Sequence, residues 1–139
     1  MSDEPEALPG AVICRTASSH IRVGTFQYFA SRKDLTALAA LLDYSIARHY
    51  PQAKSAEEFL VAAVNLQARL LAKWMGVGLI HGVMNTDNSH VGRITIDYGT
   101  CAFMDKFLPT KVFSSIDRQG RYGYSNQTNI AAWNMAQLA

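Results

Sequence analysis

The stretch from Ser55 to Gly76 constrains the fold of this 139-residue chain more than any other part of its sequence. Ser55 is followed three residues later by Glu58, which is the pattern of a helix capping box. Gly76 and Gly78 then supply the stop signal that commonly follows a helix. Between these signals apolar side chains recur every three or four residues, at Phe59, Leu60, Ala63, Val64, Leu70, Leu71, Trp74 and Met75. The sequence therefore predicts a long amphipathic helix.

A second long helix is predicted upstream. Ser31-Arg32-Lys33-Asp34 resembles a capping box, and Pro51 forces the helix to stop. The apolar stripe between them consists of Leu35, Leu38, Leu41, Leu42 and Ile46. We also expect a short closing helix over residues 130–138.

Two short stretches have the composition of strands. Residues 11–15 are an apolar run after the turn signal Pro9-Gly10, and residues 92–96 alternate and contain β-branched side chains. Residues 21–29 fit a helix or a strand equally well. The expected class is α+β, mainly α, with a small sheet.

Composition excludes several classes of protein. With 49% hydrophobic residues and a net charge of +2, the chain reads as one folded domain rather than a disordered one. No run approaches the roughly 20 apolar residues of a membrane span, and no basic cluster suggests nucleic acid as a partner. Residues 1–6 are acidic without an apolar core, so they do not form a secretory signal. We expect a cytoplasmic protein with a flexible tail over residues 1–9.

Charged residues make up 17% of the chain, below the roughly 25% typical of globular proteins. This predicts a surface that is covered by a partner, such as a second copy of the chain or a separate chain. Cys14 and Cys101 lie far apart and outside zinc-binding spacings, so neither a disulfide framework nor a zinc site is indicated. We expect both cysteines to be buried.

The most informative segment runs from His81 to Gly99. Asn88 follows His81 by seven residues, as the asparagine follows the histidine in the catalytic loop of protein kinases. Asp97-Tyr98-Gly99 then takes the place of the kinase metal-binding Asp-Phe-Gly. An amide oxygen and a carboxylate on two sides of a hairpin suit Mg²⁺. This order predicts a fragment of a kinase-like C-lobe, with two long helices and a catalytic-loop hairpin.

The position of the kinase catalytic base holds Val83, which cannot accept a proton. Asp87, next to Asn88, is a different acid that could take a proton from an incoming nucleophile. The alternative is that Asp87 and Asn88 simply cap a turn, as such residues often do. Their combination with Asp97 at hairpin spacing favours a site.

The chain resembles the selenoprotein O family of kinase-fold protein adenylyltransferases, over nearly its whole length from Pro9. The motif HGVMNTDN followed at this distance by TIDYG is highly specific. The segments that carry the resemblance are Gly10 to Val12, Ser19 to Phe26, His81 to Asn88, Thr95 to Gly99, Gly120 to Tyr122 and Asn126-Gln127.

The resemblance implies transfer of AMP from ATP to Ser, Thr or Tyr hydroxyls of proteins, with ATP flipped relative to kinases. Asp87 then corresponds to the proton acceptor, and Asn88 and Asp97 to the ligands of Mg²⁺ or Mn²⁺. Arg15 and Arg22 correspond to contacts with the nucleotide phosphates, alongside Asp97 with its metal. Without the family, these two arginines would read as solvated or paired surface charges.

The chain also departs from the family. The Gly-rich segment, the phosphate-binding lysine and its glutamate partner lie upstream of Gly10, in a lobe that these residues do not include, and the C-terminal region is also missing. We therefore expect residues 10–139 to be part of a C-lobe that is inactive alone. Thr128 replaces a usual proline, and Ser89-His90 replaces a more apolar pair that we do not expect to touch a ligand. A non-catalytic remnant that binds a partner or itself is the alternative, and phosphotransferase activity is disfavoured by Val83.

The histidines receive structural assignments. We expect the imidazole of His81 to bond to the backbone near the metal-binding turn, because a ligand role would call for other soft donors nearby. His20, His49 and His90 are expected to form no cluster.

Overall fold

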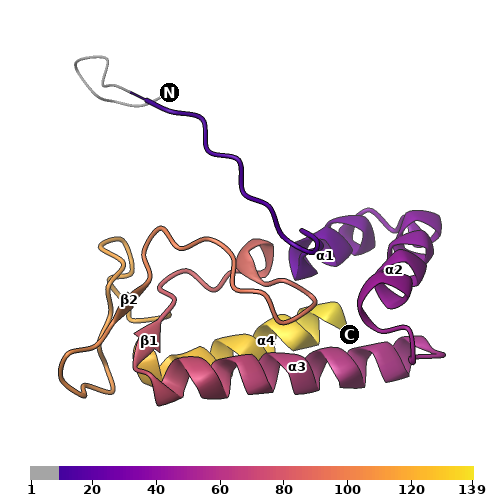
Figure 1. Cartoon of the computed structure of the whole chain (residues 1–139). Coiled ribbons are helices and arrows are strands. Elements are labelled where there is room, and N and C mark those ends of the chain that lie inside the picture. The colour runs from indigo at the N-terminus through magenta and orange to yellow at the C-terminus, as the bar shows by residue number, and fades with distance from the viewer. Residues whose placement is uncertain (1–9) are drawn as a thin grey trace.

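The structure, a computed structural model, describes residues 10–139, so the predicted tail over residues 1–9 lies outside the described residues. The class predicted from the sequence, α+β and mainly α, is confirmed for this part of the chain (Figure 1). The α-helices are α1 (Val23–Ser31), α2 (Leu35–His49), α3 (Ala56–Gly76) and α4 (Gln127–Leu138), the strands are β1 (Leu79–Ile80) and β2 (Ala102–Phe103), and the 3₁₀ turns are η1 (Thr86–Asn88) and η2 (Tyr124–Asn126).

Helix α3 confirms the strongest prediction from the sequence. The hydroxyl of Ser55 accepts a hydrogen bond from the Glu58 backbone N–H at 3.1 Å. The Glu58 carboxylate in turn accepts one from the Lys54 backbone N–H at 2.7 Å. Two of the free donors at the helix start are thereby satisfied. The helix ends at Gly76, and Gly78 turns the chain with a φ of +69°.

Helix α2 also forms as predicted, but its cap is the last residue of the predicted box. The Asp34 carboxylate accepts a hydrogen bond from the Ala37 backbone N–H at 3.0 Å. Ser31 belongs instead to the end of α1, where its hydroxyl donates to the Tyr28 carbonyl. The stretch 21–29, which the sequence left open, is therefore helical from Val23 onward.

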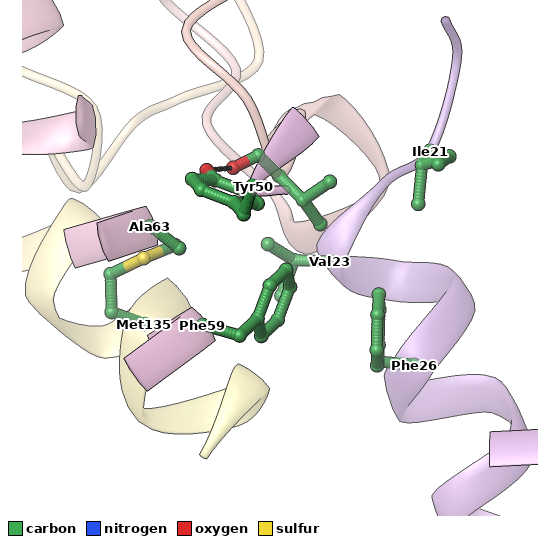
Figure 2. Close-up of a cluster of buried hydrophobic side chains, with 8 residues drawn as sticks. Ile21, Val23, Phe26, Tyr50, Phe59, Ala63 and Met135 are labelled. Atoms are coloured by element: carbon green, nitrogen blue, oxygen red, sulfur yellow. Dashed lines mark hydrogen bonds between the residues drawn. The ribbon is translucent and has the colours of Figure 1, made fainter. Parts of the chain in front are cut away.

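The main core lies where α1, α2, α3 and α4 meet. Figure 1 shows α4 running alongside α3, and the two helices are in contact over much of the length of α4. Figure 2 shows the side chains that fill the space between α1, α3 and α4. The rings of Phe26 and Phe59 stack with centroids 5.9 Å apart, and Tyr50 meets Phe59 edge-on at 5.1 Å. Because these aromatic contacts link three helices, they fix the position of α1 on α3.

The small sheet is not where the sequence predicted it. Strands β1 and β2 pair antiparallel, with Leu79 opposite Phe103 and Ile80 opposite Ala102. The predicted strand over residues 11–15 is wrong: this segment has no regular structure, and Val12 is fully exposed. Within residues 10–139 no strand pairs with it, and an isolated strand leaves its backbone groups to water.

The predicted strand over residues 92–96 is also wrong. It forms only a single bridge, between Ser89 and Thr95. Side chains take the place of a ladder there, because the Thr95 carbonyl accepts from the Arg15 guanidinium and its hydroxyl accepts from the Trp74 indole. Strand propensity was therefore satisfied locally by side-chain donors from distant segments.

The closing helix forms but starts three residues earlier than expected, at Gln127. The expectation that both cysteines are buried is wrong for Cys14, which is exposed, while Cys101 is partly buried. Within residues 10–139, no helix combines the length and the apolar character needed to cross a bilayer.

Candidate active site

The segment that carries the candidate residues leaves the sheet at the end of β1 and returns at β2. Its start is anchored by Gln127, a fully buried side chain at the first position of α4. The Gln127 Oε1 accepts a hydrogen bond from the His81 backbone N–H at 3.0 Å, and its Nε2 donates to the Leu79 carbonyl at 3.0 Å. One amide therefore fixes both sides of β1 and sets the direction in which the loop departs.

His81 links the two halves of the loop. Its Nδ1 accepts a long hydrogen bond from the Val83 backbone N–H at 3.4 Å, so the ring proton lies on Nε2, which donates to the Ile96 carbonyl at 2.7 Å. Burial lowers the pKa of His81, which keeps the imidazole neutral. The expected structural role of His81 is confirmed, because its ring fixes the backbone directly before Asp97.

Gly82 allows the two halves of the loop to approach closely. Its φ is +86°, and a Cβ added there would lie 2.5 Å from Thr100 Oγ1 and 2.9 Å from the Thr100 carbonyl oxygen. The Thr100 hydroxyl donates to the His81 carbonyl at 3.2 Å. Only glycine combines this backbone conformation with this contact.

Asn88 and Asp97 meet across the loop. The Asn88 Nδ2 donates to the Asp97 Oδ2 at 2.8 Å and to the Val83 carbonyl at 3.2 Å. Asp97 has a φ of +59°, and its Oδ1 accepts from the Gly99 backbone N–H at 3.3 Å. Left-handed backbone is uncommon outside glycine and tends to persist where the surroundings enforce it. The structure thus brings together two of the residues that the sequence singled out.

The donors at this position fit a hard divalent cation such as Mg²⁺ or Mn²⁺. Asp97 offers carboxylate oxygens and Asn88 an amide oxygen, which are ligands that Mg²⁺ prefers. Among residues 10–139, no three His, Cys, Asp or Glu side chains gather into a metal cluster. Two protein ligands leave most of an octahedral shell to water and phosphate oxygens, which is how Mg²⁺ is commonly held at nucleotide sites.

Asp87 lies on η1, exposed and next to the first turn of α1. A Cβ added to Gly24 would lie 3.1 Å from the Asp87 backbone nitrogen, so glycine at that position lets α1 approach the loop. Asp87 and Arg22 line the same open hollow of about 460 Å³, together with residues of α1. A carboxylate and a guanidinium therefore face one solvent-accessible space.

Arg15 lies at the opposite end of the site, beside the Asp97 turn. Its guanidinium donates to the Thr95 carbonyl at 2.5 Å and lies 5.1 Å from the centroid of the Tyr98 ring. Arg22 and Arg15 are both exposed, so neither is committed to the core. The structure places one arginine near each of the two acidic candidates.

Sequence reasoning missed the residues that hold the loop from behind. The Asn134 Nδ2 of α4 donates to the Met84 carbonyl at 2.9 Å and to the Ser89 hydroxyl at 2.6 Å. The Gln67 Nε2 of α3 donates to the carbonyls of His90 and Gly92. Both amides lie on apolar helix faces, and a polar residue on such a face is the signal that could have found them.

Two further expectations are wrong. His49 and His90 do form a cluster, because both imidazoles bond to the Ser19 hydroxyl, whereas His20 is exposed. The pair Ser89-His90 was not expected to touch a proposed ligand. His90 pairs with Arg22 through a backbone bridge, and the Ser89 carbonyl accepts from the backbone N–H that follows Arg22.

Comparison with known proteins identifies the family. The sequence profile of the family described as "Protein adenylyltransferase SelO" matches residues 1–139. The chain belongs to this family. The SelO chain is 63% identical over 133 residues to a protein of Ruegeria pomeroyi and 64% identical over 132 residues to one of Jannaschia sp.. A protein of Maridesulfovibrio salexigens is 59% identical over 138 residues, and all three are named "Protein nucleotidyltransferase YdiU".

These matches cover 95% or 96% of the SelO chain but only 28% of each relative. The chain therefore spans a little over a quarter of the length of the relatives that it matches. The family is that of protein nucleotidyltransferases, and the activity of the whole protein concerns far more chain than is present here.

The buried histidines of the SelO chain predict a loss of stability in acid. Burial is the main cause that lowers the pKa of His90 to about 4, with a smaller contribution from His49. An unfolded histidine titrates near 6.5, so below that pH the unfolded chain takes up protons that the folded chain refuses. We expect the free energy of unfolding to fall by about 2–3 kcal/mol between pH 6.5 and 4 through His90, with His81 adding to the fall.

Urea unfolding at a series of pH values measures this slope. The variant His90→Gln should show a shallower slope, and His20→Gln, which changes an exposed imidazole, is the matched control that should keep it. An identical slope in His90→Gln would contradict the assignment.

Proposed function

We propose that residues 10–139 are the part of a kinase-like C-lobe that supplies the proton acceptor and the metal ligands of a protein adenylyltransferase. In this proposal AMP passes from ATP to Ser, Thr or Tyr hydroxyls of protein substrates, with Mg²⁺ or Mn²⁺ as the cofactor. The observation that carries the proposal is the contact between Asn88 and Asp97, 2.8 Å apart, beside the exposed carboxylate of Asp87. Family membership supports the nucleotidyl transfer.

The chemistry assigns a distinct task to each group. The substrate hydroxyl oxygen forms a bond to the α-phosphorus, its proton passes to the Asp87 carboxylate, and the bond to the bridging oxygen of the β-phosphate breaks. Pyrophosphate leaves with the negative charge of that bond. Arg15 and Arg22 would stabilise this charge, because guanidinium groups bind phosphate oxygens through paired charge-assisted hydrogen bonds. Asn88 and Asp97 would hold the metal, which supplies further charge stabilisation when bound.

Val83 distinguishes this proposal from a kinase activity. A kinase needs a carboxylate at that position to orient the attacking hydroxyl, and an isopropyl group cannot accept a proton. Asp87 lies four residues further on, on η1 rather than in the preceding loop. A base in a different place favours attack on a different phosphorus.

Isotopic labelling separates the two reactions. We expect label from the α-phosphate of ATP, and not from the γ-phosphate, to become attached to protein when residues 10–139 replace the matching segment of the Ruegeria pomeroyi relative. The 63% identity over 133 residues makes this exchange practicable. Label from the γ-phosphate alone would restore the kinase interpretation.

A second candidate is a non-catalytic module that binds another copy of the chain. It is favoured by the apolar surface of the described residues, where Phe107, Ile116 and Val12 are 74%, 84% and 100% exposed. An apolar groove of about 480 Å³ also lies between α1, α2 and α3, away from the candidate site. Apolar patches of several hundred Å² usually mark an interface. The two candidates differ in whether transfer appears once the rest of the protein is supplied.

A further inference from the structure

Ser19, His49 and His90 form a cluster of hydrogen bonds that no part of the proposed reaction uses. They come from the segment before α1, from the last residue of α2 and from the loop after η1. The Ser19 hydroxyl lies 2.5 Å from His49 Nε2 and 2.9 Å from His90 Nε2. The two imidazole rings are nearly perpendicular, with centroids 5.2 Å apart. Ser19 and His90 are buried, at 7% and 1% exposed.

The backbone fixes the direction of these hydrogen bonds. The His90 Nδ1 accepts from the Gly92 backbone N–H at 2.8 Å, so the neutral ring carries its proton on Nε2. That Nε2 donates to the Ser19 hydroxyl and, at 3.1 Å, to the Ser19 carbonyl. The hydroxyl has one proton, which it therefore donates to His49 Nε2. A relay of three side chains results, with each donor satisfied.

The relay lies beside two backbone hydrogen bonds that join the segment before α1 to the loop after η1. The Val23 N–H donates to the Ser89 carbonyl at 2.8 Å, and the Val91 N–H donates to the Ile21 carbonyl at 3.0 Å. Arg22 and His90 face each other between these bonds as an antiparallel bridge. Arg22 is thus held against the residue that lies two positions after Asn88.

We propose that Ser19, His49 and His90 are positioning residues that set the place of Arg22 relative to Asp87 and Asn88. The inference rests on the proposed function for the meaning of that placement, although the clamp itself can be tested without any nucleotide. Arg22 and Asp87 line one hollow, so a shift of residues 19–23 along residues 89–92 would move the guanidinium away from the carboxylate. Small displacements of phosphate-binding groups are costly, because transfer depends on orientation.

Amide hydrogen exchange in the 139-residue chain tests the clamp. In Ser19→Ala we expect the Val23 and Val91 amides to exchange about five- to tenfold faster, as for the loss of a buried hydrogen bond that supports a local contact. Amides in the middle of α3 should keep their rates, which shows that the variant is folded.

Ser45→Ala is the matched control. Ser45 is fully buried, and its hydroxyl donates to the Leu41 carbonyl within α2 at 2.7 Å. This variant removes a buried hydroxyl as well, but it should leave the Val23 and Val91 amides unchanged. Unchanged exchange at both amides in Ser19→Ala would overturn the proposal.

A double-mutant cycle then tests whether Ser19 acts through Arg22. The probe is the α,β-methylene analogue of ATP with Mn²⁺, titrated into the chain and followed by NMR. We expect Arg22→Ala to weaken binding about tenfold or more and Ser19→Ala about three- to tenfold. The double variant should bind no more weakly than Arg22→Ala alone, because Ser19 has nothing left to position.

Each outcome has a distinct meaning. Losses that add in the double variant would show that Ser19 acts independently of Arg22, which overturns its positioning role. A parent chain that binds no analogue would overturn the proposed function instead, and the exchange rates then decide the clamp alone.

Discussion

Replacing Asp97 with alanine is expected to abolish metal-dependent nucleotide binding by this chain. Asp97 is one of two proposed protein ligands for the metal and the only one with a negative charge. The carboxylate also accepts the hydrogen bond that holds the Asn88 amide, so its removal frees the second ligand as well. We expect the stabilisation of bound nucleotide by Mn²⁺ to disappear, a loss of about 100-fold or more.

Titration of Mn²⁺ with the nucleotide present and absent measures this loss. Asp43→Ala is a suitable control, because it removes one exposed carboxylate from α2 and leaves the site untouched. Asp97→Asn preserves the shape of the side chain and tolerates the positive φ, so it separates loss of charge from collapse of the turn. Equal metal dependence in Asp97→Ala and the parent chain would disprove the metal assignment.

The helices could be predicted because their signals are local. Ser55 with Glu58, and the apolar side chains at three- or four-residue spacing, specify α3 without reference to the rest of the chain. The strands could not be predicted in this way. Residues 92–96 have strand composition, but their hydrogen bonds go to Arg15, Gln67 and Trp74, which come from distant segments. Pairing is a property of neighbours in space, which sequence periodicity does not contain.

The candidate site shows the same division. Asn88 and Asp97 were found from their spacing, and the structure brings their side chains together. The Ser19 relay was missed, because its partners are 30 and 71 residues away in sequence. Single histidines on otherwise apolar segments look alike whether or not they meet, so only the packing of α2 against the loop reveals the cluster.

The largest effect we expect concerns catalysis by these residues alone and with the rest of the protein supplied. The chain spans 28% of its relatives, and the family's Gly-rich segment and phosphate-binding lysine have no counterpart in it. The metal pair and two arginines would then bind a tetra-anion from one side. Orientation can contribute roughly 7–11 kcal/mol to lowering a barrier. Without it, we expect AMP transfer by the 139-residue chain to be undetectable.

Supplying the missing segments should restore transfer, and this restored activity allows a direct test of Asp87. When residues 10–139 replace their counterpart in the Ruegeria pomeroyi relative, Asp87→Ala should reduce transfer of α-label about 100- to 10,000-fold, the usual contribution of a general base. Nucleotide binding should change little, because the base contacts the acceptor hydroxyl rather than ATP. Asp105→Ala, which removes an exposed carboxylate beyond β2, should retain activity. Transfer that survives Asp87→Ala would assign the base elsewhere, whereas no transfer by the unmutated chimera would favour the non-catalytic module.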